Sequence, residues 1–305
     1  MQTTWDEIIS QPDAWRRAAA LSDACRAAVP DGERVAFIGC GTSWFVAQAL
    51  ATLRESAGLG ESDAFAASEA PLTREYDRVV AISRSGTTTE VARALRELPA
   101  GVATVAIVAV TEGAVLDAAD QTIVLAFADE RSVVQTRFAT SVVALFRAAY
   151  GHDMDHVATE AQRMLDKNPS LGDIPYGVDL LDCQRFVFLG HGWTVGLAHE
   201  AALKLREAAL AATESYPAME YRHGPVALAE PGTAVWWLGP DDANLVTEVA
   251  ALGATTVADA SDPLVSLVAI HLLALGLADR RGLDPDTPRN LSRSVVLEPA
   301  VGGAR

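Results

Sequence analysis

Arg78-Val-Val-Ala-Ile-Ser-Arg-Ser-Gly-Thr-Thr-Thr-Glu-Val-Ala-Arg-Ala-Leu95 is the stretch that decides the fold. It opens with an apolar, β-branched run, breaks into a loop of hydroxyl-bearing residues and glycine, and resumes with the apolar spacing of a helix. Thr87 and Glu90 fit the capping box that starts a helix. The stretch therefore predicts a strand, a turn and a helix that starts at the carboxyl end of the strand.

The turn between this strand and helix is suited to an anion. Ser83, Ser85 and Thr88 place hydroxyl groups beside a helix amino terminus, whose unpaired N–H groups carry roughly half a positive charge. Arg84 would complete a phosphate cradle. The alternative interpretation is an ordinary strand–turn–helix with a good cap.

Working outward, the chain alternates strands with helices, which predicts an α/β protein with parallel sheets flanked by helices. The run Val35–Gly41 is mirrored at an offset of 151 residues by Phe186–Gly192. Two copies of one α/β unit are the economical explanation. We expect a helical lead-in over residues 1–30, a phosphate-binding domain over 31–160, a second domain over 161–284 and a tail over 285–305.

Local patterns refine this division. Gln11-Pro12 should separate a short lead helix from a longer one, and Arg131–Tyr150 is predicted to be one long apolar helix. The apolar stretch Leu264–Ala278 has 15 residues, so it predicts a buried helix and not a membrane span. Trp44 stands where a dinucleotide-binding loop requires its third glycine, which argues against a nicotinamide cofactor.

Composition bounds the function. Of the 305 residues 50% are hydrophobic and 21% charged, which is typical of a globular protein, and the net charge of −16 disfavours nucleic acid and anionic membranes as partners. The three cysteines form no C-x-x-C pair, and the first residues lack the features of a signal peptide. We expect a cytoplasmic protein without a metal or cofactor.

The second half carries charged groups at helical spacing. Glu200, Lys204 and Glu207 share one helix face, and they could form either a solvated ion-pair stripe or part of a site. Downstream, the loop Glu214–Pro225 holds His223 before a Gly-Pro turn. It is either an acid–base site or a turn with a structural histidine.

Six short motifs occur along the chain: Glu7-Ile-x-x-Gln11-Pro12, Cys40-Gly-Thr-Ser43, Ile82-Ser-Arg-Ser-Gly86, Ala202-Leu-Lys-Leu-Arg-Glu207, Glu220-x-x-His223-Gly-Pro225 and Pro288-Arg-Asn-Leu291. In this order they resemble the sugar isomerase (SIS) family, and in particular the isomerase half of glucosamine-6-phosphate synthase and its stand-alone relatives. The resemblance covers nearly the whole chain and implies two SIS domains, each with a five-stranded parallel sheet.

The resemblance also implies roles for residues. Glu207 corresponds to the carboxylate that moves a proton between C1 and C2, Lys204 would assist it, and His223 would open the sugar ring in the site of a neighbouring subunit. The resemblance therefore also implies that the chain forms a homodimer or a larger homo-oligomer. The implied ligands of a hexose 6-phosphate are Gly41, Thr42, Ser43, Ser83, Arg84, Ser85, Thr88, Val133 and Arg293.

One departure from the family limits the expected reaction. Arg293 stands where the synthase carries a Schiff-base lysine, and arginine cannot act as that nucleophile. The chain is therefore not expected to be a complete glutamine-dependent amidotransferase. We expect an isomerase or deaminase of a hexose or hexosamine 6-phosphate. The alternatives are a non-catalytic sugar-phosphate regulator, or a fructosamine-6-phosphate deglycase in which Arg293 binds an anionic group near C1.

Overall fold

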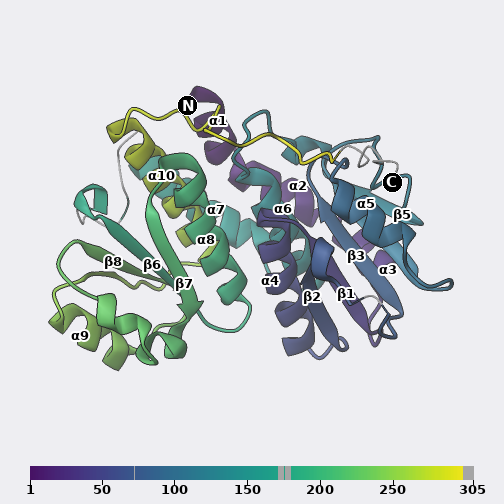
Figure 1. Ribbon diagram of the computed structural model, residues 1–305, viewed down its shortest axis with the longest axis horizontal. Coiled ribbons are helices and arrows are strands. Elements are labelled where there is room, and N and C mark those ends of the chain that lie inside the picture. The colour runs from purple at the N-terminus through teal and green to yellow at the C-terminus, as the bar shows by residue number, and fades with distance from the viewer. Residues whose placement is uncertain (72, 171–174, 176–179, 298–305) are drawn as a thin grey trace, which may run out of the picture.

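Two parallel β-sheets lie side by side, with helices between and around them (Figure 1). The computed structural model describes residues 1–71, 73–170, 175 and 180–297. The predicted α/β class is confirmed, because strands followed by helices bury both faces of each sheet.

The first sheet has five strands in the order β2-β1-β3-β4-β5. Every residue of the central strands β1 and β3 is buried, as expected for strands covered on both faces. The strand order reverses between β1 and β3, and in open α/β sheets a ligand binds beyond the carboxyl ends at such a point. The strands are β1 (Val35–Gly39), β2 (Ser62–Ala66), β3 (Arg78–Ser83), β4 (Ala103–Val108) and β5 (Gln121–Val124).

The second sheet repeats this order with one strand fewer in the described part of the chain, β7-β6-β8-β9. The prediction of five strands in each sheet is wrong here. Only residues 258–262 separate the last strand from the next helix, which leaves no chain for a fifth strand. The strands are β6 (Arg185–Gly190), β7 (Ala212–Pro217), β8 (Thr233–Leu238) and β9 (Thr255–Val257).

Helices α4 (Thr42–Ser56) and α8 (Thr194–Ala209) pack on each other between the two sheets (Figure 1). They approach each other closely at Gly196, where an added Cβ would lie 2.5 Å from the carbonyl oxygen of Phe45 and 2.7 Å from the backbone nitrogen of Ala49. Glycine is the residue that permits so close a crossing. The contact brings the first turn of α4 next to the middle of α8.

The remaining helices lie partly on the outer faces of the sheets and partly in the core between them. The lead-in forms three helices where two were predicted, and Pro12 lies in the first turn of the second. These helices are α1 (Gln2–Ile9), α2 (Gln11–Ala19), α3 (Ser22–Ala28), α5 (Thr89–Arg96), α6 (Arg137–Ala149), α7 (Met154–Lys167), α9 (Ala243–Ala251) and α10 (Pro263–Arg280).

Helix α6 begins at Arg137, six residues later than its apolar pattern predicted. Two buried carboxylates hold the preceding loop in an irregular conformation. Glu7 accepts hydrogen bonds from the backbone N–H groups of Arg131 (2.6 Å) and Ser132 (3.3 Å), and Glu130 accepts from the backbone of Thr136 (2.6 Å). The loop is therefore anchored at both ends.

Helix α10 has the length and the hydropathy of a membrane span, and among the described helices no other one does. In the structure 83% of it is buried against the rest of the chain. It packs on α8 and α7, so it is a core helix, as its sequence predicted.

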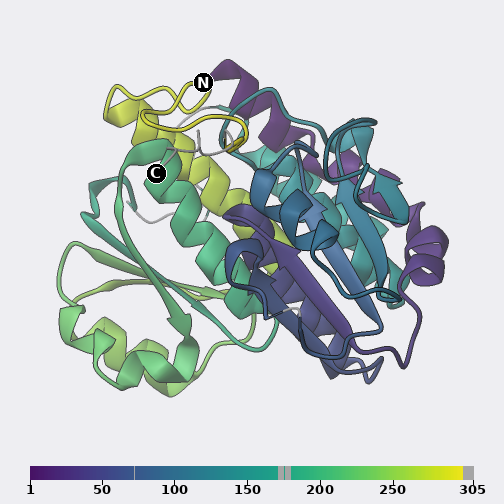
Figure 2. The same cartoon turned by 45° about the vertical axis from the view of Figure 1, so that its right-hand side comes forward.

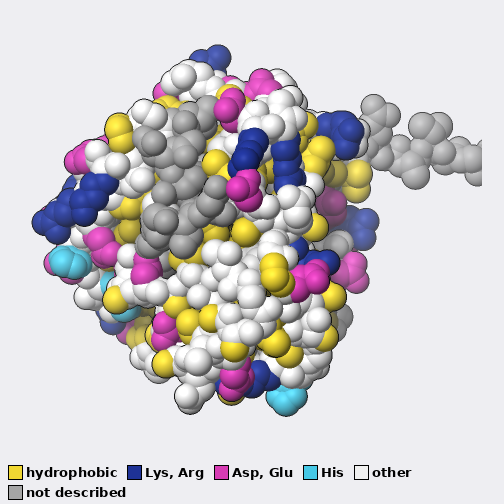
Figure 3. All heavy atoms as spheres, turned by 90° about the vertical axis from the view of Figure 1, so that its left-hand side faces the viewer, with side chains coloured by type: hydrophobic (Ala, Val, Ile, Leu, Met, Phe, Trp, Pro, Cys, Tyr) yellow, Lys and Arg dark blue, Asp and Glu magenta, His cyan; other side chains and the backbone are white. Residues whose placement is uncertain are grey.

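Residues 288–297, which follow α10, cross the top of the molecule past α1 and end beside α5 (yellow in Figures 1 and 2). The start of this crossing is anchored by Asp286, which accepts hydrogen bonds from the backbone N–H groups of Thr3 (3.1 Å) and Thr4 (2.8 Å). On the side of the second sheet, the surface mixes acidic, basic and hydrophobic side chains (Figure 3).

Candidate functional site

A small cavity of about 180 Å³ lies at the carboxyl end of β1, between the first turn of α4 and the C-terminal tail. Gly41, with φ of 54°, turns the chain from β1 into α4 and leaves room at the rim. The residues that line the cavity are Cys40, Gly41, Thr42, Thr88, Val133, Gln135, Glu207, Leu291, Ser292, Arg293, Ser294 and Val295.

Glu207 lines this cavity from α8, and the buried Lys204 of the same helix contacts two of the lining residues, Glu207 and Thr42. The Lys204 Nζ donates to Glu207 Oε2 at 2.5 Å and to Thr42 Oγ1 at 3.0 Å, so groups from both halves of the chain meet at one nitrogen. Lys204 is buried, whereas the Glu207 side chain is 21% exposed. Burial lowers the pKa of Lys204, but the carboxylates of Glu200 and Glu207 outweigh it and raise that pKa. The pair can therefore present a charged base beside an ammonium donor.

The hydroxyl loop between β3 and α5 is closed by the tail. Ser83 Oγ and Thr88 Oγ1 lie 3.2 Å apart, and Ser294 of the tail is hydrogen-bonded to Ser85 Oγ at 3.0 Å and to Thr87 Oγ1 at 2.9 Å. The backbone carbonyl of Val295 accepts from the N–H of Thr89 at 3.3 Å. The tail thus occupies hydrogen-bond donors of this loop, the Ser85 hydroxyl and the N–H of Thr89, that were predicted to bind a phosphate.

The predicted capping box is wrong. Helix α5 starts at Thr89, and its N-cap residue Thr88 makes no side-chain capping bond. The Thr87 hydroxyl donates to Ser85 Oγ at 3.1 Å instead, and one carboxylate oxygen of Glu90 is buried with no hydrogen-bond partner among the residues that the structure describes. Competition from neighbouring hydroxyl groups explains why Thr87 does not cap the helix.

Arg84 lies in a different place from the one that the sequence suggested. Its guanidinium is buried and donates to the carbonyl oxygens of Ser132 (3.0 Å), Val133 (3.3 Å) and Arg293 (3.0 Å). It also lies 3.8 Å from the Glu130 carboxylate. Arg84 therefore ties the hydroxyl loop to the 130–136 loop and to the tail, and it does not line the cavity.

Arg293 lines the cavity, but its positive charge is paired. Its guanidinium donates to Asp129 Oδ1 at 2.5 Å, and both side chains are partly exposed. An anionic group near C1 would therefore have to compete with Asp129 for this arginine.

Six of the predicted site residues are not among those that line the cavity: Ser43, Ser83, Arg84, Ser85, Lys204 and His223. Ser43 is buried in the first turn of α4 and is not among the lining residues. His223 is exposed at the end of the short helix η4 (Ala218–Arg222), and it is not among them either. A single chain therefore brings together Glu207, Lys204, Thr42, Val133, Thr88 and Arg293, and leaves His223 outside.

Sequence reasoning missed Gln135, which lines the cavity and has a buried Oε1 without a hydrogen-bond partner in the described part of the chain. It also missed the anchoring roles of Glu7 and Glu130. Burial raises the pKa of Glu7, and the nearby Glu130 raises it further. The lead-in motif contained the signal for Glu7, since a glutamate on an apolar helix face needs a buried partner.

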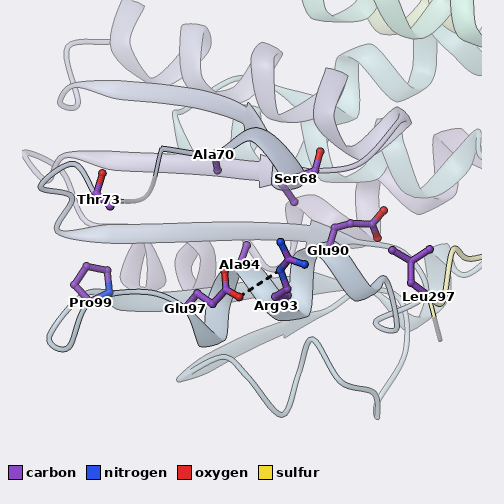
Figure 4. Close-up of a pocket in the computed structure, with 10 residues that line it drawn as sticks. Ser68, Ala70, Thr73, Glu90, Arg93, Ala94, Glu97, Pro99 and Leu297 are labelled. Atoms are coloured by element: carbon purple, nitrogen blue, oxygen red, sulfur yellow. Dashed lines mark ion pairs between the residues drawn. The ribbon is translucent and has the colours of Figure 1, made fainter. Parts of the chain in front are cut away.

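A larger cavity, of about 480 Å³, lies on the outer side of α5 (Figure 4). Its charged residues include Arg93 and Glu97, which pair with each other at 3.3 Å, and Leu297 of the tail borders it. It contains neither Glu207 nor Lys204. The smaller cavity is the candidate site, because the acid–base groups meet there.

Comparisons with known proteins identify the family of the first domain. Residues 31–150 match the sequence model of the SIS domain. Glutamine–fructose-6-phosphate aminotransferases from Caulobacter vibrioides and Methanothermobacter thermautotrophicus are 30% and 28% identical over 96% and 97% of this chain. The chain spans 58% and 55% of those two proteins, about half of their length.

Two solved structures share the fold along nearly the whole chain. Glucosamine-6-phosphate deaminase from Thermotoga maritima is 27% identical with a TM-score of 0.82, covering 97% of this chain and 100% of that one. Tagatose-6-phosphate ketose/aldose isomerase from Escherichia coli is 21% identical with a TM-score of 0.78, covering 97% of each chain. The resemblance drawn from the six motifs is confirmed.

Proposed function

We propose that this chain, which carries a SIS domain over residues 31–150, is an isomerase or deaminase of a hexose or hexosamine 6-phosphate. The observation that carries the proposal is the contact of Lys204 with Glu207 (2.5 Å) and Thr42 (3.0 Å) at the edge of the cavity. Relatives named as a phosphosugar deaminase and as sugar-phosphate aminotransferases support the substrate class.

In this proposal Glu207 removes the proton from one of the two carbons C1 and C2 and returns it to the other. The ammonium group of Lys204 stabilises the negative charge that develops on the enediol oxygen. For an amino sugar the same steps lead to a ketose and release ammonia after water is added. Ser83, Ser85, Thr87 and the first N–H groups of α5 would hold the phosphate once the tail moves aside.

We also propose that residues 31–160 and 161–284 are two diverged SIS units. The common strand order β2-β1-β3-β4 and β7-β6-β8-β9 supports this. Gly41 and Gly192 occupy matching turns after β1 and β6, with φ of 54° and 57°. Since His223 is exposed and lies outside the cavity lining, a second copy of the chain would have to supply it to the site.

The test is turnover on a panel of hexose and hexosamine 6-phosphates, with ammonia and ketose measured separately. Glu207→Gln should lower kcat by ~10²–10⁴-fold, because it removes the general base while the phosphate contacts remain. The matched control is Glu230→Gln, an exposed glutamate of the second half. Unchanged turnover in Glu207→Gln would refute the assigned base, and tight binding without conversion in the wild type would indicate a regulator.

The role of His223 can be tested by mixing subunits. Glu207→Gln and His223→Ala chains are each expected to be inactive. If the histidine acts across an interface, hybrids of the two contain one complete site and recover part of the activity. Absence of recovery in proven hybrids would place His223 outside the reaction. Release of free amino acid from a fructosamine 6-phosphate would instead identify a deglycase.

A further inference from the structure

Glu200 is a buried acid that the proposed reaction does not use. It lies on α8 one turn before Lys204, and both side chains are 1% exposed. Its carboxylate lies 3.5 Å from the Lys204 Nζ, and neither oxygen has a hydrogen-bond partner within the described residues. Neither Glu200 nor Lys204 is among the residues that line the cavity, so Glu200 can act on a substrate only through its neighbours Lys204, Thr42 and Glu207.

The groups around Lys204 come from three helices. Glu200 and Glu207 face it from α8, Thr42 from α4, and His271 from α10. Burial, together with the charge of Lys204, lowers the pKa of His271 to about 3, so this histidine is neutral. Glu130 adds a weaker negative potential at Lys204. Glu200 and Glu207 are thus the two acidic side chains closest to the buried ammonium group.

The two acids differ in exposure, and this separates their roles. Glu207 is 21% exposed at the cavity, whereas burial raises the pKa of Glu200 to about 8 although Lys204 opposes the rise. At neutral pH Glu200 therefore carries a proton, and Lys204 forms a neutral pair with Glu207. Above this pKa a second carboxylate appears beside the same nitrogen. An ionised neighbour favours the charged form of a lysine, which burial alone disfavours.

We propose that Glu200 is a positioning residue that keeps Lys204 protonated beside Glu207 and Thr42 as the pH rises. It supplies a negative charge in the range where a buried lysine would otherwise lose its proton. The effect on turnover rests on the proposed function. The effect on the charge of Lys204 is independent of it.

The chain contains two lysines, Lys167 and Lys204, so the charge of Lys204 can be observed directly. Protein labelled with ¹⁵N-lysine gives two Nζ signals, which Lys167→Arg assigns. In Glu200→Gln, Lys204 should release its proton at a pH lower by at least about one unit, a tenfold loss of proton affinity. Lys167 is the internal control and should not change. An equal Lys204 titration in wild type and variant would overturn the proposal.

Turnover gives a second readout that a merely structural role would not produce. Near pH 7 the variant replaces one neutral side chain by another, so kcat should stay within about threefold of wild type. Above the pH at which Lys204 of the variant releases its proton, kcat should fall by about tenfold per pH unit relative to wild type. An equal loss at pH 7 and above that pH would show that Glu200 only supports the fold, and this would overturn the proposal.

The proposal can still be tested if the variant does not fold or if the wild type is inactive. If Glu200→Gln does not fold, the wild type still decides, because its Lys204 must keep its proton beyond the ordinary lysine pKa of 10.5. A wild-type Lys204 that releases its proton below that pH overturns the proposal. If the wild type converts no sugar phosphate, the proposed function fails, whereas the titration of Lys204 still tests the role of Glu200.

Discussion

Gly196→Ala should damage both stability and turnover, because it separates the two helices that bring Thr42 and Lys204 together. An added Cβ would lie 2.5 Å from the Phe45 carbonyl oxygen, whereas ordinary contacts start at 3.4 Å, so α4 and α8 must move apart by about 0.9 Å. The same shift would lengthen the 3.0 Å bond between Lys204 and Thr42 to about 3.9 Å, which is beyond hydrogen-bond range.

Two energies oppose each other in this variant. Overpacking costs roughly 1–3 kcal/mol, and the upper end applies because the obstructing atoms belong to backbone. Alanine is better than glycine inside a helix by about 1 kcal/mol. Overpacking wins by about 2 kcal/mol, which should lower Tm by roughly 4 °C in a protein of this size.

The assay is thermal unfolding together with turnover on the best substrate of the panel. A misplacement of about 1 Å at the reacting groups is expected to lower kcat by ~10²-fold. If Gly196→Ala were as stable and as active as the wild type, the crossing would not be the device that positions the site.

Two further predictions concern the link between the halves and the tail. Arg147 on α6 donates two hydrogen bonds of 2.7 Å to Asp262, the N-cap of α10, so Arg147→Met should lower the free energy of unfolding by about 3 kcal/mol. Adding Asp262→Ser keeps a capping group and removes the unpaired charge. Chemical denaturation that finds the double variant no more stable than the single one would exclude the ion pair as the cause. Ser294→Ala removes the hydrogen bonds of 3.0 and 2.9 Å that join the tail to Ser85 and Thr87, so it should weaken docking of the tail by about 1 kcal/mol. Because the tail then competes less, calorimetry should show a dissociation constant for inorganic phosphate that is lower by up to about fivefold. Weaker phosphate binding would instead make Ser294 a phosphate ligand.

The central strands and their loops could be predicted from the sequence, because β-branched runs buried on both faces give a strong pattern. The edge strands β2 and β7 could not. They read Ser-Asp-Ala-Phe-Ala and Ala-Thr-Glu-Ser-Tyr-Pro, and their residues are partly exposed. Such strands depend on backbone pairing with β1 and β6, which a local pattern does not reveal.

Within the site, residue types were easier to predict than their partners. The spacing of Lys204 and Glu207 placed them on one helix face, and the structure agrees. Arg84 beside a hydroxyl loop suggested a phosphate ligand, but three carbonyl groups from distant segments take its donors. Those carbonyls lie about 50 and 209 residues along the chain, and no local rule brings them there.

The distribution of charge around the cavity explains how an acidic chain could hold a dianion without a basic patch. Arg84 is buried against carbonyl oxygens, Arg293 is paired with Asp129, and Lys204 is paired with Glu207. Each of these cations is therefore compensated by neighbours within the described residues.

The groups that remain for a phosphate are hydroxyl groups and the N–H groups at the start of α5, and these bind by position more than by net charge. The tail occupies the same groups with a serine hydroxyl and a carbonyl oxygen, both of which are neutral. A dianion makes stronger hydrogen bonds to such donors than a neutral group does, so the tail can cover the empty site and still yield to a phosphorylated substrate.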